Sequence, residues 1–522
     1  MRSITATACF LFVFLSSNFL HAQAVDVQHY RFQLELSDQN DRIRGRAEVQ
    51  VLFRQPLAEW ALDLVQTGSD GKGMKVDSVQ GETVAGFRQE QNKLLIRLKS
   101  PSGPALQTFR ILYGGTPADG LIISKNKFGD RTFFADNWPN RAHQWIPCND
   151  RPEDKASVEF LVTAPLRYQV VSNGLLQEQT DLDQTSRLTH WKEDIPIPTK
   201  VMVIGAAQFA ISRLDSSEAV PVTAWVYPQN RQQGFYDYAL ATPILHFFSN
   251  YIGPYPFRKL ANVQSTTIFG GMENASAIFY AENSVTGNRE SEELLAHEIA
   301  HQWFGNMASE RSFAHLWLSE GFATYMTDIY LDARYGREAF HRRLKAAREK
   351  VIGFSHVSKS AVVDSVSDLM DLLNANSYQK GSWVLHMLRN EVGDSAFHRT
   401  IQQYYQQYQG GNADSKDFQR VAESVAGRSL EAFFHQWLYT PGIPQLHPSW
   451  KWERGKVLLT IQQTGNSKFS FPLEVGLVAA GGKQTVHQVK VTPTTSSFEL
   501  PAAAKPAKVV LDPEINLLFE EK

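Results

Sequence analysis

The chain has 522 residues, of which 43% are hydrophobic and 20% charged, and its formal net charge is −2. This near-neutral balance provides no electrostatic basis for binding nucleic acid or an anionic membrane surface. A chain of this length is also too long for one hydrophobic core, so about two to four domains are expected.

The first residues resemble a secretory signal peptide. Met1-Arg2 precedes an apolar run from Ile4 to Leu20, and Ala22-Gln23-Ala24 is a small-residue cleavage site. We therefore predict a signal peptide over residues 1–24 and an exported protein, either periplasmic or secreted. No later segment approaches about 18 uninterrupted apolar residues, so no membrane span is expected in the mature chain.

Cleavage would leave a single cysteine, Cys148, and so no intramolecular disulfide is expected. A lone thiol in an enzyme invites a nucleophile hypothesis. Its setting between Ile146-Pro147 and Asn149-Asp150 favours a buried small residue instead.

The spacing of apolar residues changes twice along the chain. Residues 25–211 alternate with period two, as at Tyr30, Phe32, Leu34 and Leu36, which predicts an N-terminal antiparallel β domain. Helical spacing dominates residues 212–440, apart from a strand-like stretch around residues 263–281. Alternation then returns over residues 441–522, which predicts a C-terminal β-sandwich, and the whole chain is expected to be a multidomain α+β protein.

The segment His297-Glu298-Ile299-Ala300-His301 is the most informative part of the chain. Residues four apart share one face of a helix, so His297 and His301 can present two imidazole nitrogens to one metal ion. Glu298 lies about 100° further round the helix, where its carboxylate can take a proton from an attacking water. The bland alternative is an amphipathic helix with two half-buried histidines.

Glu320 can supply the third ligand of a one-ion zinc site. It follows His301 after eighteen residues and heads a second helical run. A catalytic zinc site has three protein ligands and an open position. The helix already has an apolar stripe that can pack against a core, formed by Leu294, Leu295, Ile299 and Trp303. Packing therefore does not explain why the two histidines are present.

Two further residues carry weaker signals. Glu273 lies in a Gly-rich turn, where a carboxylate can bind a cationic amine, although a surface turn glutamate is the simpler interpretation. Tyr378 lies at the start of a helix through Trp383 and Leu385, and amphipathic packing is its simpler interpretation.

Taken together, four motifs resemble the aminopeptidase N and leukotriene-A hydrolase family of zinc metallopeptidases. They occur in the family's order and at similar spacings, and they are Gly270-Gly271-Met272-Glu273-Asn274, His297-Glu298-Ile299-Ala300-His301, Leu318-Ser319-Glu320-Gly321 and Tyr378-Gln379-Lys380-Gly381. The resemblance covers essentially the whole mature chain and implies a β domain, a thermolysin-like domain over 212–440 and a β-sandwich. It also leads us to expect a short form that lacks the helical fourth domain of longer members.

The resemblance implies roles for these residues. His297, His301 and Glu320 would hold one Zn²⁺ ion, and Glu298 would be the general base. Glu273 would capture the substrate's free N-terminus, and the backbone of Gly270, Gly271 and Met272 would pair with an extended peptide. The hydroxyl of Tyr378 would face the oxyanion of the tetrahedral intermediate.

The chain departs from the family in the first domain. Many members carry a glutamine there that helps to hold the substrate amine, but the matching stretch, Phe133-Phe134-Ala135-Asp136-Asn137, has none. Asp136 can substitute for it, and a turn residue capping its own backbone is the alternative. His315, two residues before Trp317, is expected to support the site or pack rather than to bind metal.

The implied function is a zinc aminopeptidase that releases single N-terminal residues from peptides. Two alternatives are an epoxide hydrolase-like activity and a catalytically inactive peptide-binding scaffold. The first would need a lipid cavity to which the fourth domain contributes in leukotriene-A hydrolase. The second is disfavoured because all three ligands and the base are present.

Overall fold

The computed structural model describes residues 24–214, 220–366 and 368–522, so the predicted signal peptide lies outside the described residues except for Ala24. The chain divides into two compact units, residues 1–246 with 255–309 and residues 247–254 with 310–522. Each is described by itself. None of the helices in the described ranges is both long and apolar enough to cross a bilayer.

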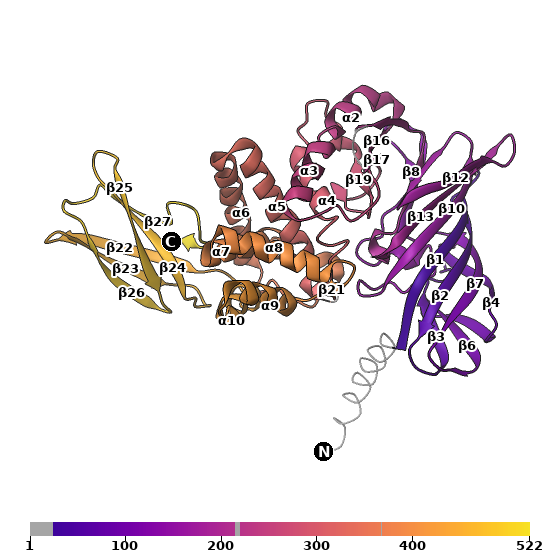
Figure 1. The fold of residues 1–522 in the computed structure, drawn as a ribbon, viewed down its shortest axis with the longest axis horizontal. Coiled ribbons are helices and arrows are strands. Elements are labelled where there is room, and N and C mark those ends of the chain that lie inside the picture. Colours follow the sequence, from indigo (N-terminus) through magenta and orange to yellow (C-terminus); the bar gives the residue numbers. More distant parts are fainter. Residues whose placement is uncertain (1–23, 215–219, 367) are drawn as a thin grey trace, which may run out of the picture. The chain divides into compact units, whose positions relative to one another are not determined.

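The N-terminal part of the first unit is built from strands, drawn indigo to purple in Figure 1. They are β1 (Val25–Glu35), β2 (Ile43–Phe53), β3 (Leu57–Asp63), β4 (Gly73–Gln80), β5 (Val84–Glu90), β6 (Lys93–Ser102), β7 (Ala105–Thr116), β8 (Leu121–Lys125), β9 (Arg131–Ala135), β10 (Lys155–Pro165), β11 (Gln169–Ser172), β12 (Leu175–Asp181), β13 (Ser186–Pro198) and β14 (Ile204–Ala207). The short 3₁₀ helices η1 (Ala142–Gln144) and η2 (Thr199–Val201) lie between them.

These strands form three sheets, in the orders β12-β13-β10-β1-β2-β7-β4, β11-β14-β9-β8 and β3-β6-β5. All neighbours in the largest sheet are antiparallel except β1 and β10. The predicted period-two spacing is visible in the burial of β1: Tyr30, Phe32 and Leu34 are at most 1% exposed, whereas the residues between them are partly exposed. The predicted antiparallel β domain is therefore present.

The rest of the first unit contains a mixed five-stranded sheet. Its strands are β15 (Ala210–Arg213), β16 (Val222–Val226), β17 (Leu260–Ser265), β18 (Gly271–Met272) and β19 (Ala277–Ala281), in the order β15-β16-β17-β19-β18. Every residue of β17 is buried, as expected of a strand with parallel neighbours on both sides. β18 lies at the edge of the sheet.

Helices of the same region are α2 (Arg231–Tyr238), α4 (Glu292–Ala300), η3 (Pro228–Asn230) and η4 (Glu282–Ser284). The helix α3 (Ala241–Tyr251) begins in this unit, and its residues from 247 onward belong to the second unit. α4 begins with two acidic residues, Glu292 and Glu293, which the helix dipole favours, and it buries Leu295 and Ile299. It ends at Ala300, so Trp303 lies beyond it and packs its ring against Tyr255 at 5.4 Å instead. The predicted domain limit at residue 211 falls inside β15.

The second unit begins as a helical assembly. Its elements are α5 (Trp317–Tyr335), α6 (Arg337–Val357), α7 (Gly381–Val392), α8 (Asp394–Tyr408), α9 (Ser415–Ala426) and α10 (Glu431–Phe434), the π-helices η7 (Asn376–Lys380) and η8 (His435–Tyr439), the 3₁₀ helices η5 (Phe313–His315) and η6 (Leu369–Leu372), and the short strands β20 (Ser309–Glu310) and β21 (Asn412–Ala413). α5 is buried on all sides from Trp317 to Leu331, which makes it the core of this assembly.

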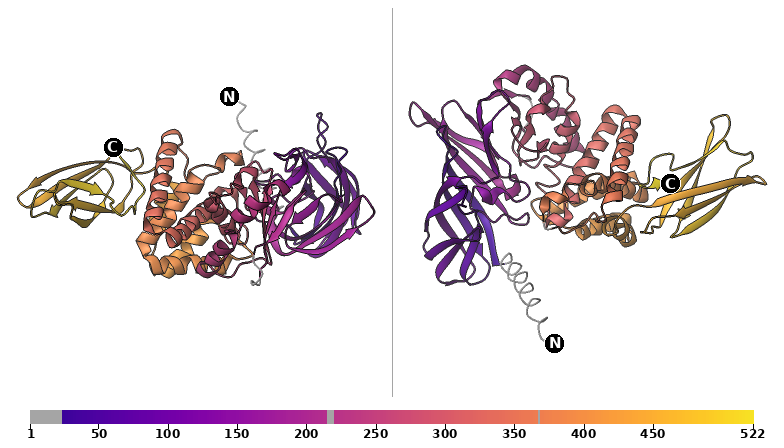
Figure 2. Two further views of the ribbon diagram at one scale, coloured as in Figure 1. Left: turned by 90° about the horizontal axis from the view of Figure 1, so that it is seen from above. Right: turned by 180° about the vertical axis from the view of Figure 1, so that it is seen from behind.

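A two-sheet β structure follows the helices, drawn yellow in Figure 2. Its strands are β22 (Gln445–Glu453), β23 (Lys456–Gln463), β24 (Phe471–Val478), β25 (Gln484–Val491), β26 (Thr495–Pro501), β27 (Lys508–Leu511) and β28 (Glu520–Glu521). They form the sheets β26-β23-β22-β28 and β25-β24-β27. The predicted limit at residue 440 falls between η8 and β22, and the order of β domain, helical part and β-rich C-terminal region agrees with the predicted fold class.

Candidate functional site

The two histidines of α4 converge as their spacing predicts. Their Nε2 atoms lie 3.1 Å apart, and His301 is only 1% exposed. Nδ1 of His301 lies 3.1 Å from the carbonyl oxygen of Phe304, so the ring donates from Nδ1 and keeps Nε2 as the acceptor. A backbone carbonyl in this position is how metal-binding histidines are commonly oriented.

Glu320 completes a donor set for a metal ion. It lies in the first turn of α5 and is 5% exposed. The ligand atoms of His297, His301 and Glu320 lie within 4.8 Å of one another. Two imidazoles and a carboxylate form the set that a catalytic zinc site uses, and the oriented His301 ring fits this use.

Glu298 lies against the edge strand β18. It is 5% exposed, and a Cβ atom built on Gly271 would lie 2.3 Å from its Oε1. The carboxylate of Glu298 therefore occupies the space that a side chain at position 271 would need.

The strand β18 presents a free edge beside Glu298. Gly271 and Met272 pair with Tyr280 and Phe279 of β19, and Ala281 N–H donates to the carbonyl of Gly270. Because hydrogen-bonding direction alternates along an antiparallel strand, the N–H and C=O of Gly271 point away from β19. This is the geometry that lets an extended peptide add as a further strand.

Glu273 directly follows β18, and hydrogen bonds to its backbone carbonyl hold it in place. Its carbonyl oxygen accepts hydrogen bonds from Gln302 Nε2 at 2.7 Å and Asn306 Nδ2 at 2.6 Å. Both donors belong to the segment after α4, so the turn that carries Glu273 is fixed to the helix that carries the histidines. Glu273 lies two residues after Gly271, just beyond the end of β18.

Tyr378 lies in the π-helix η7, which is continuous with α7. Its side chain is half-buried. A Cβ atom on Gly321 would lie 2.9 Å from the backbone of Gly381, so α5 and the start of α7 touch through two glycines. Glu320 directly precedes Gly321, and Tyr378 lies three residues before Gly381. The backbone contact between the two glycines therefore fixes the positions of both residues relative to each other.

Asp136 is fully buried, and both of its carboxylate oxygens have partners. Oδ1 accepts a hydrogen bond from Arg141 at 2.6 Å, and Oδ2 accepts from Thr267 Oγ1 and from Ile268 N–H. Burial raises the pKa of this carboxyl, and Arg141 opposes the rise. Asp136 thus fixes the segment that leads into β18, and its direct contact with a substrate stays a prediction.

Two other sequence interpretations concern Cys148 and His315. Cys148 is fully buried, and burial raises the pKa of its thiol well above the ordinary value, so it is not a reactive nucleophile. His315 Nδ1 lies 2.9 Å from Ser415 Oγ, a packing contact in the second unit.

Sequence reasoning overlooked the residues that hold the site in place. Gln302, Asn306 and Lys259 are buried and donate to backbone carbonyls of the turn that carries Glu273. The buried Lys380, which lies in η7 with Tyr378, donates to the carbonyl of Gly442. Gln302 and Asn306 come shortly after the His-Glu-x-x-His segment, and this position is the only indication of their role in the sequence. A lysine that will be buried looks in the sequence like a solvated one.

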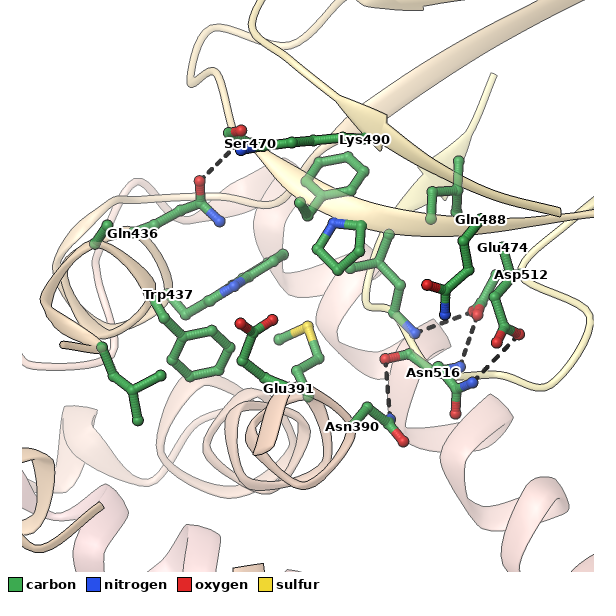
Figure 3. A pocket seen from close by; sticks show the side chains of 18 of the residues that line it. Asn390, Glu391, Gln436, Trp437, Ser470, Glu474, Gln488, Lys490, Asp512 and Asn516 are labelled. Carbon is green, nitrogen blue, oxygen red and sulfur yellow. Dashed lines mark hydrogen bonds between the residues drawn. The ribbon is translucent and has the colours of Figure 1, made fainter. Parts of the chain in front are cut away.

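A cavity of about 780 Å³ in the second unit is separate from these residues. It lies between α7 and α10 on one side and β24 and β25 on the other (Figure 3). Its charged groups are partly paired, since Arg428 donates to Glu391 and Asn516 donates to Glu474. None of the predicted site residues lines it.

A helix with His-Glu-x-x-His, two converged histidines and a glutamate on a following helix is the arrangement of the zincin class of metallopeptidases. Comparison with known families agrees with this class. Residues 236–437 match the peptidase family M1 domain, and residues 26–201 match the peptidase M1 N-terminal domain. The chain therefore belongs to peptidase family M1.

Several named relatives are similar over much of the chain. Probable aminopeptidase 1 of Saccharolobus solfataricus is 26% identical over 400 residues, covering 73% of this chain and 49% of that protein. Human glutamyl aminopeptidase is 26% identical over 461 residues, covering 82% of this chain and 48% of that protein. The chain spans about half the length of these relatives.

A solved structure has the same fold. The crystal structure of Legionella pneumophila aminopeptidase A in complex with aspartic acid superposes with a TM-score of 0.82 at 17% identity. The match covers 96% of this chain and 60% of that chain. The predicted fold class is thereby confirmed.

Proposed function

We propose that this protein is a zinc-dependent aminopeptidase that releases single residues from the free N-termini of peptides. The observation that carries the proposal is that Glu298 of α4 lies against Gly271 of the edge strand β18, while Glu273 directly follows that strand. Gly271 lies against Glu298, and Glu273 is two residues further along the chain. The two carboxylates would thus flank the position of the substrate's first residue.

His297, His301 and Glu320 would hold the metal ion. When bound, Zn²⁺ supplies Lewis-acid polarisation of the scissile carbonyl and lowers the pKa of water from about 15.7 toward 7. The histidine orientation by Phe304 supports this assignment because Nε2 of His301 stays available as a ligand atom.

The remaining steps belong to side chains of this chain. Glu298 would take a proton from the attacking water and pass it to the leaving amine. The hydroxyl of Tyr378 would donate to the developing oxyanion, and Glu273 would pair with the substrate's ammonium group. The outward N–H and C=O of Gly271 would bind the peptide backbone and align the bond with Glu298.

The names of the relatives support an aminopeptidase over the two alternatives. Each is called an aminopeptidase, and the scaffold alternative would be expected to lose a ligand or the base. We also propose that the protein is exported, on the strength of residues 1–24. N-terminal sequencing of the protein recovered from the cell exterior or periplasm tests that proposal.

A panel of aminoacyl-p-nitroanilides and their N-acetylated forms tests the activity. We expect turnover of free-amine substrates only, loss of turnover with a chelator, and recovery on adding Zn²⁺. Glu273→Ala should remove the preference for a free amine. Absence of turnover by the metal-replete protein, or turnover unaffected by thorough metal removal, would reject the proposal.

A further inference from the structure

Lys259 is a buried lysine whose role the proposed chemistry does not use. It precedes β17, and its side chain is among the buried groups at 6% exposure. Its ammonium donates to the carbonyl of Ser172 at 2.7 Å, the carbonyl of Ser276 at 3.0 Å and the hydroxyl of Ser276 at 3.2 Å. It also lies 5.0 Å from the ring centre of Trp191.

All three of these hydrogen-bond acceptors are uncharged. Burial lowers the pKa of Lys259, and Glu193, itself 2% exposed, acts in the opposite direction through its charge. Burying an ammonium in such a setting opposes folding, and an apolar side chain of similar length would avoid that cost. A lysine in this position therefore calls for a reason beyond packing.

Ser276, which receives two of these bonds, has a strained backbone. Its φ is +61°, in the left-handed region that suits glycine, and its side chain is fully buried. Its N–H donates to Gln302 Oε1 at 2.8 Å, and its hydroxyl accepts from Gly174 N–H. Surrounding groups thus hold Ser276 in a conformation that it would not adopt by itself.

Ser276 is three residues after Glu273, and the segment between them is held at both ends. Gln302 binds the Glu273 carbonyl at one end and the Ser276 N–H at the other. Asn173 Nδ2 donates to the carbonyl of Ala275 at 2.7 Å. Lys259 contributes a cation to this set of contacts, and through Ser276 it holds the end of the turn that follows Glu273.

We propose that Lys259 is a positioning residue that, through Ser276, holds the Glu273 turn in the geometry that binds a substrate's terminal ammonium. The inference rests on the proposed function. It assigns Lys259 no contact with the substrate, so its effect must appear through Glu273.

The test is Lys259→Met, which keeps the length of the side chain but removes the charge and the donors. We expect KM for free-amine anilides to rise at least about tenfold while kcat falls less than about threefold. The preference for a free over an N-acetylated terminus should fall, and zinc content should stay equal to that of the parent protein. A loss of kcat with unchanged KM, or equal losses for both substrate types, would overturn the proposal.

The double variant Lys259→Met, Glu273→Ala separates positioning from general weakening. If Lys259 acts through Glu273, the double variant should have the KM of Glu273→Ala alone. Additive increases in KM would overturn the proposal. Lys380→Met is the comparison variant, because that equally buried lysine donates to Gly442 at 2.8 Å and holds the helix of Tyr378. It should lower kcat and leave KM nearly unchanged.

Ser276→Gly decides the matter if Lys259→Met does not fold. Glycine accepts the +61° φ without strain but gives Lys259 no hydroxyl, so the turn should loosen while the lysine stays in place. KM for free-amine anilides should rise in this variant too, and an unchanged KM would overturn the proposal. The parent protein is measured in parallel: if it shows no chelator-sensitive turnover, the proposed function fails rather than the role of Lys259.

Discussion

Neighbouring acidic residues on α4 have different surroundings. Glu293 is exposed, whereas Glu298 is 5% exposed and lies against Gly271. Under the proposed function, two chemically identical side chains would therefore have different roles. The difference comes from the face of the helix on which each side chain lies.

Glu298→Gln should retain the metal and lose turnover. The substitution preserves shape and leaves His297, His301 and Glu320 intact, but an amide cannot accept the proton of the attacking water. We expect kcat to fall at least about 10³-fold with near-stoichiometric zinc, measured by anilide hydrolysis and metal analysis. Glu293→Gln on the same helix is the control and should be close to the parent. Substantial activity in metal-replete Glu298→Gln would remove Glu298 from its role.

Tyr378→Phe should act on the transition state rather than on binding. One neutral donor to an oxyanion is worth about 2.7–4 kcal/mol, so kcat should fall roughly 10²- to 10³-fold with little change in KM. Steady-state kinetics on one anilide measure both constants. Tyr335→Phe, at a tyrosine 54% exposed near the end of α5, is the control. A higher KM with unchanged kcat would mean that Tyr378 only packs against the substrate.

Asp154 makes the stability of the N-terminal β domain depend on pH. Burial raises the pKa of its carboxyl to about 7 from an ordinary value of 3.8, although it accepts hydrogen bonds from Val27 N–H and Asn149. Between these values the native state binds more protons than the unfolded state. The contribution of this carboxyl to stability is therefore present below about pH 4 and is lost as the pH rises through about 7.

Asp154→Asn should remove that dependence. Asparagine stays neutral, so the variant should gain in thermal midpoint relative to the parent between pH 5 and pH 8, with a change of about 1 kcal/mol per pH unit in the steepest part. Thermal unfolding at several pH values measures the difference. Asp371→Asn, on an exposed carboxyl, is the control. A constant difference between parent and Asp154→Asn across this range would contradict the assignment.

Two helices of the second unit approach each other through glycines. Gly321 lies in α5 directly after Glu320, and Gly381 begins α7 three residues after Tyr378. The absence of side chains at both positions lets the backbones touch. The close approach fixes the relative placement of two site residues that come from different parts of the sequence.

Gly321→Ala should therefore damage both stability and activity. The new methyl group would meet the backbone of Gly381 at 2.9 Å, and backbone cannot rotate away as a side chain can. We expect a loss of about 1–3 kcal/mol together with a lower kcat. Gly353→Ala in α6 is the matched control, because nothing lies within 4 Å of its new Cβ and alanine favours a helix by about 1 kcal/mol. Thermal unfolding and kinetics of the two variants give the comparison. Similar behaviour of both would show that the helices can separate without consequence.

In the second unit, an ion pair and a buried histidine join the helices to the C-terminal β structure. Arg348 of α6 donates to Asp512 at 2.6 Å and to the carbonyl of Leu517. Burial raises the pKa of Asp512 to about 6, and Arg348 opposes the rise. His386 of α7 adds a second link, with Nε2 at 2.9 Å from the carbonyl of Ile515.

Arg348→Met should loosen this junction. It leaves Asp512 buried at 4% exposure without its cation, and breaking such a pair typically costs about 3–5 kcal/mol. Limited proteolysis should then release the C-terminal β structure, and the thermal midpoint should fall. Arg342→Met, in an exposed pair with Glu338 on the same helix, should cost less than about 1 kcal/mol. Equal effects of the two variants would show that the buried pair contributes nothing particular to the junction.

At the scale of the whole molecule, the sequence predicted elements well and supporting contacts poorly. The period-two spacing around Phe32 and the helical spacing around His297 each correspond to an element of the structure, because each pattern places a whole face against a core. The end of α4 was harder, since Trp303 continues the apolar pattern although it is buried in a turn. The limit at residue 211 cuts β15, because a four-residue strand carries too little alternation to be located.

The site divides in the same way. The convergence of His297, His301 and Glu320 was predictable because a metal site restricts the spacing of its candidate ligands along the chain. Lys259 and Gln302 were not, because each acts on a carbonyl far away in the sequence, and only the folded chain brings the partners together. The buried setting of Asp136 is of this kind too: its partners Thr267 and Ile268 are about 130 residues away.

The short edge strand β18 has a consequence for the fate of a peptide under the proposed function. An edge that binds only backbone treats every extended chain alike, and Glu273 marks the position from which the chain is measured. Each cleavage creates a new amine on the remaining peptide, so the product of one cycle has the chemical features of the next substrate. The protein would then shorten a peptide stepwise, and its progress would stop where a residue, such as a proline, cannot offer the backbone N–H that the edge requires.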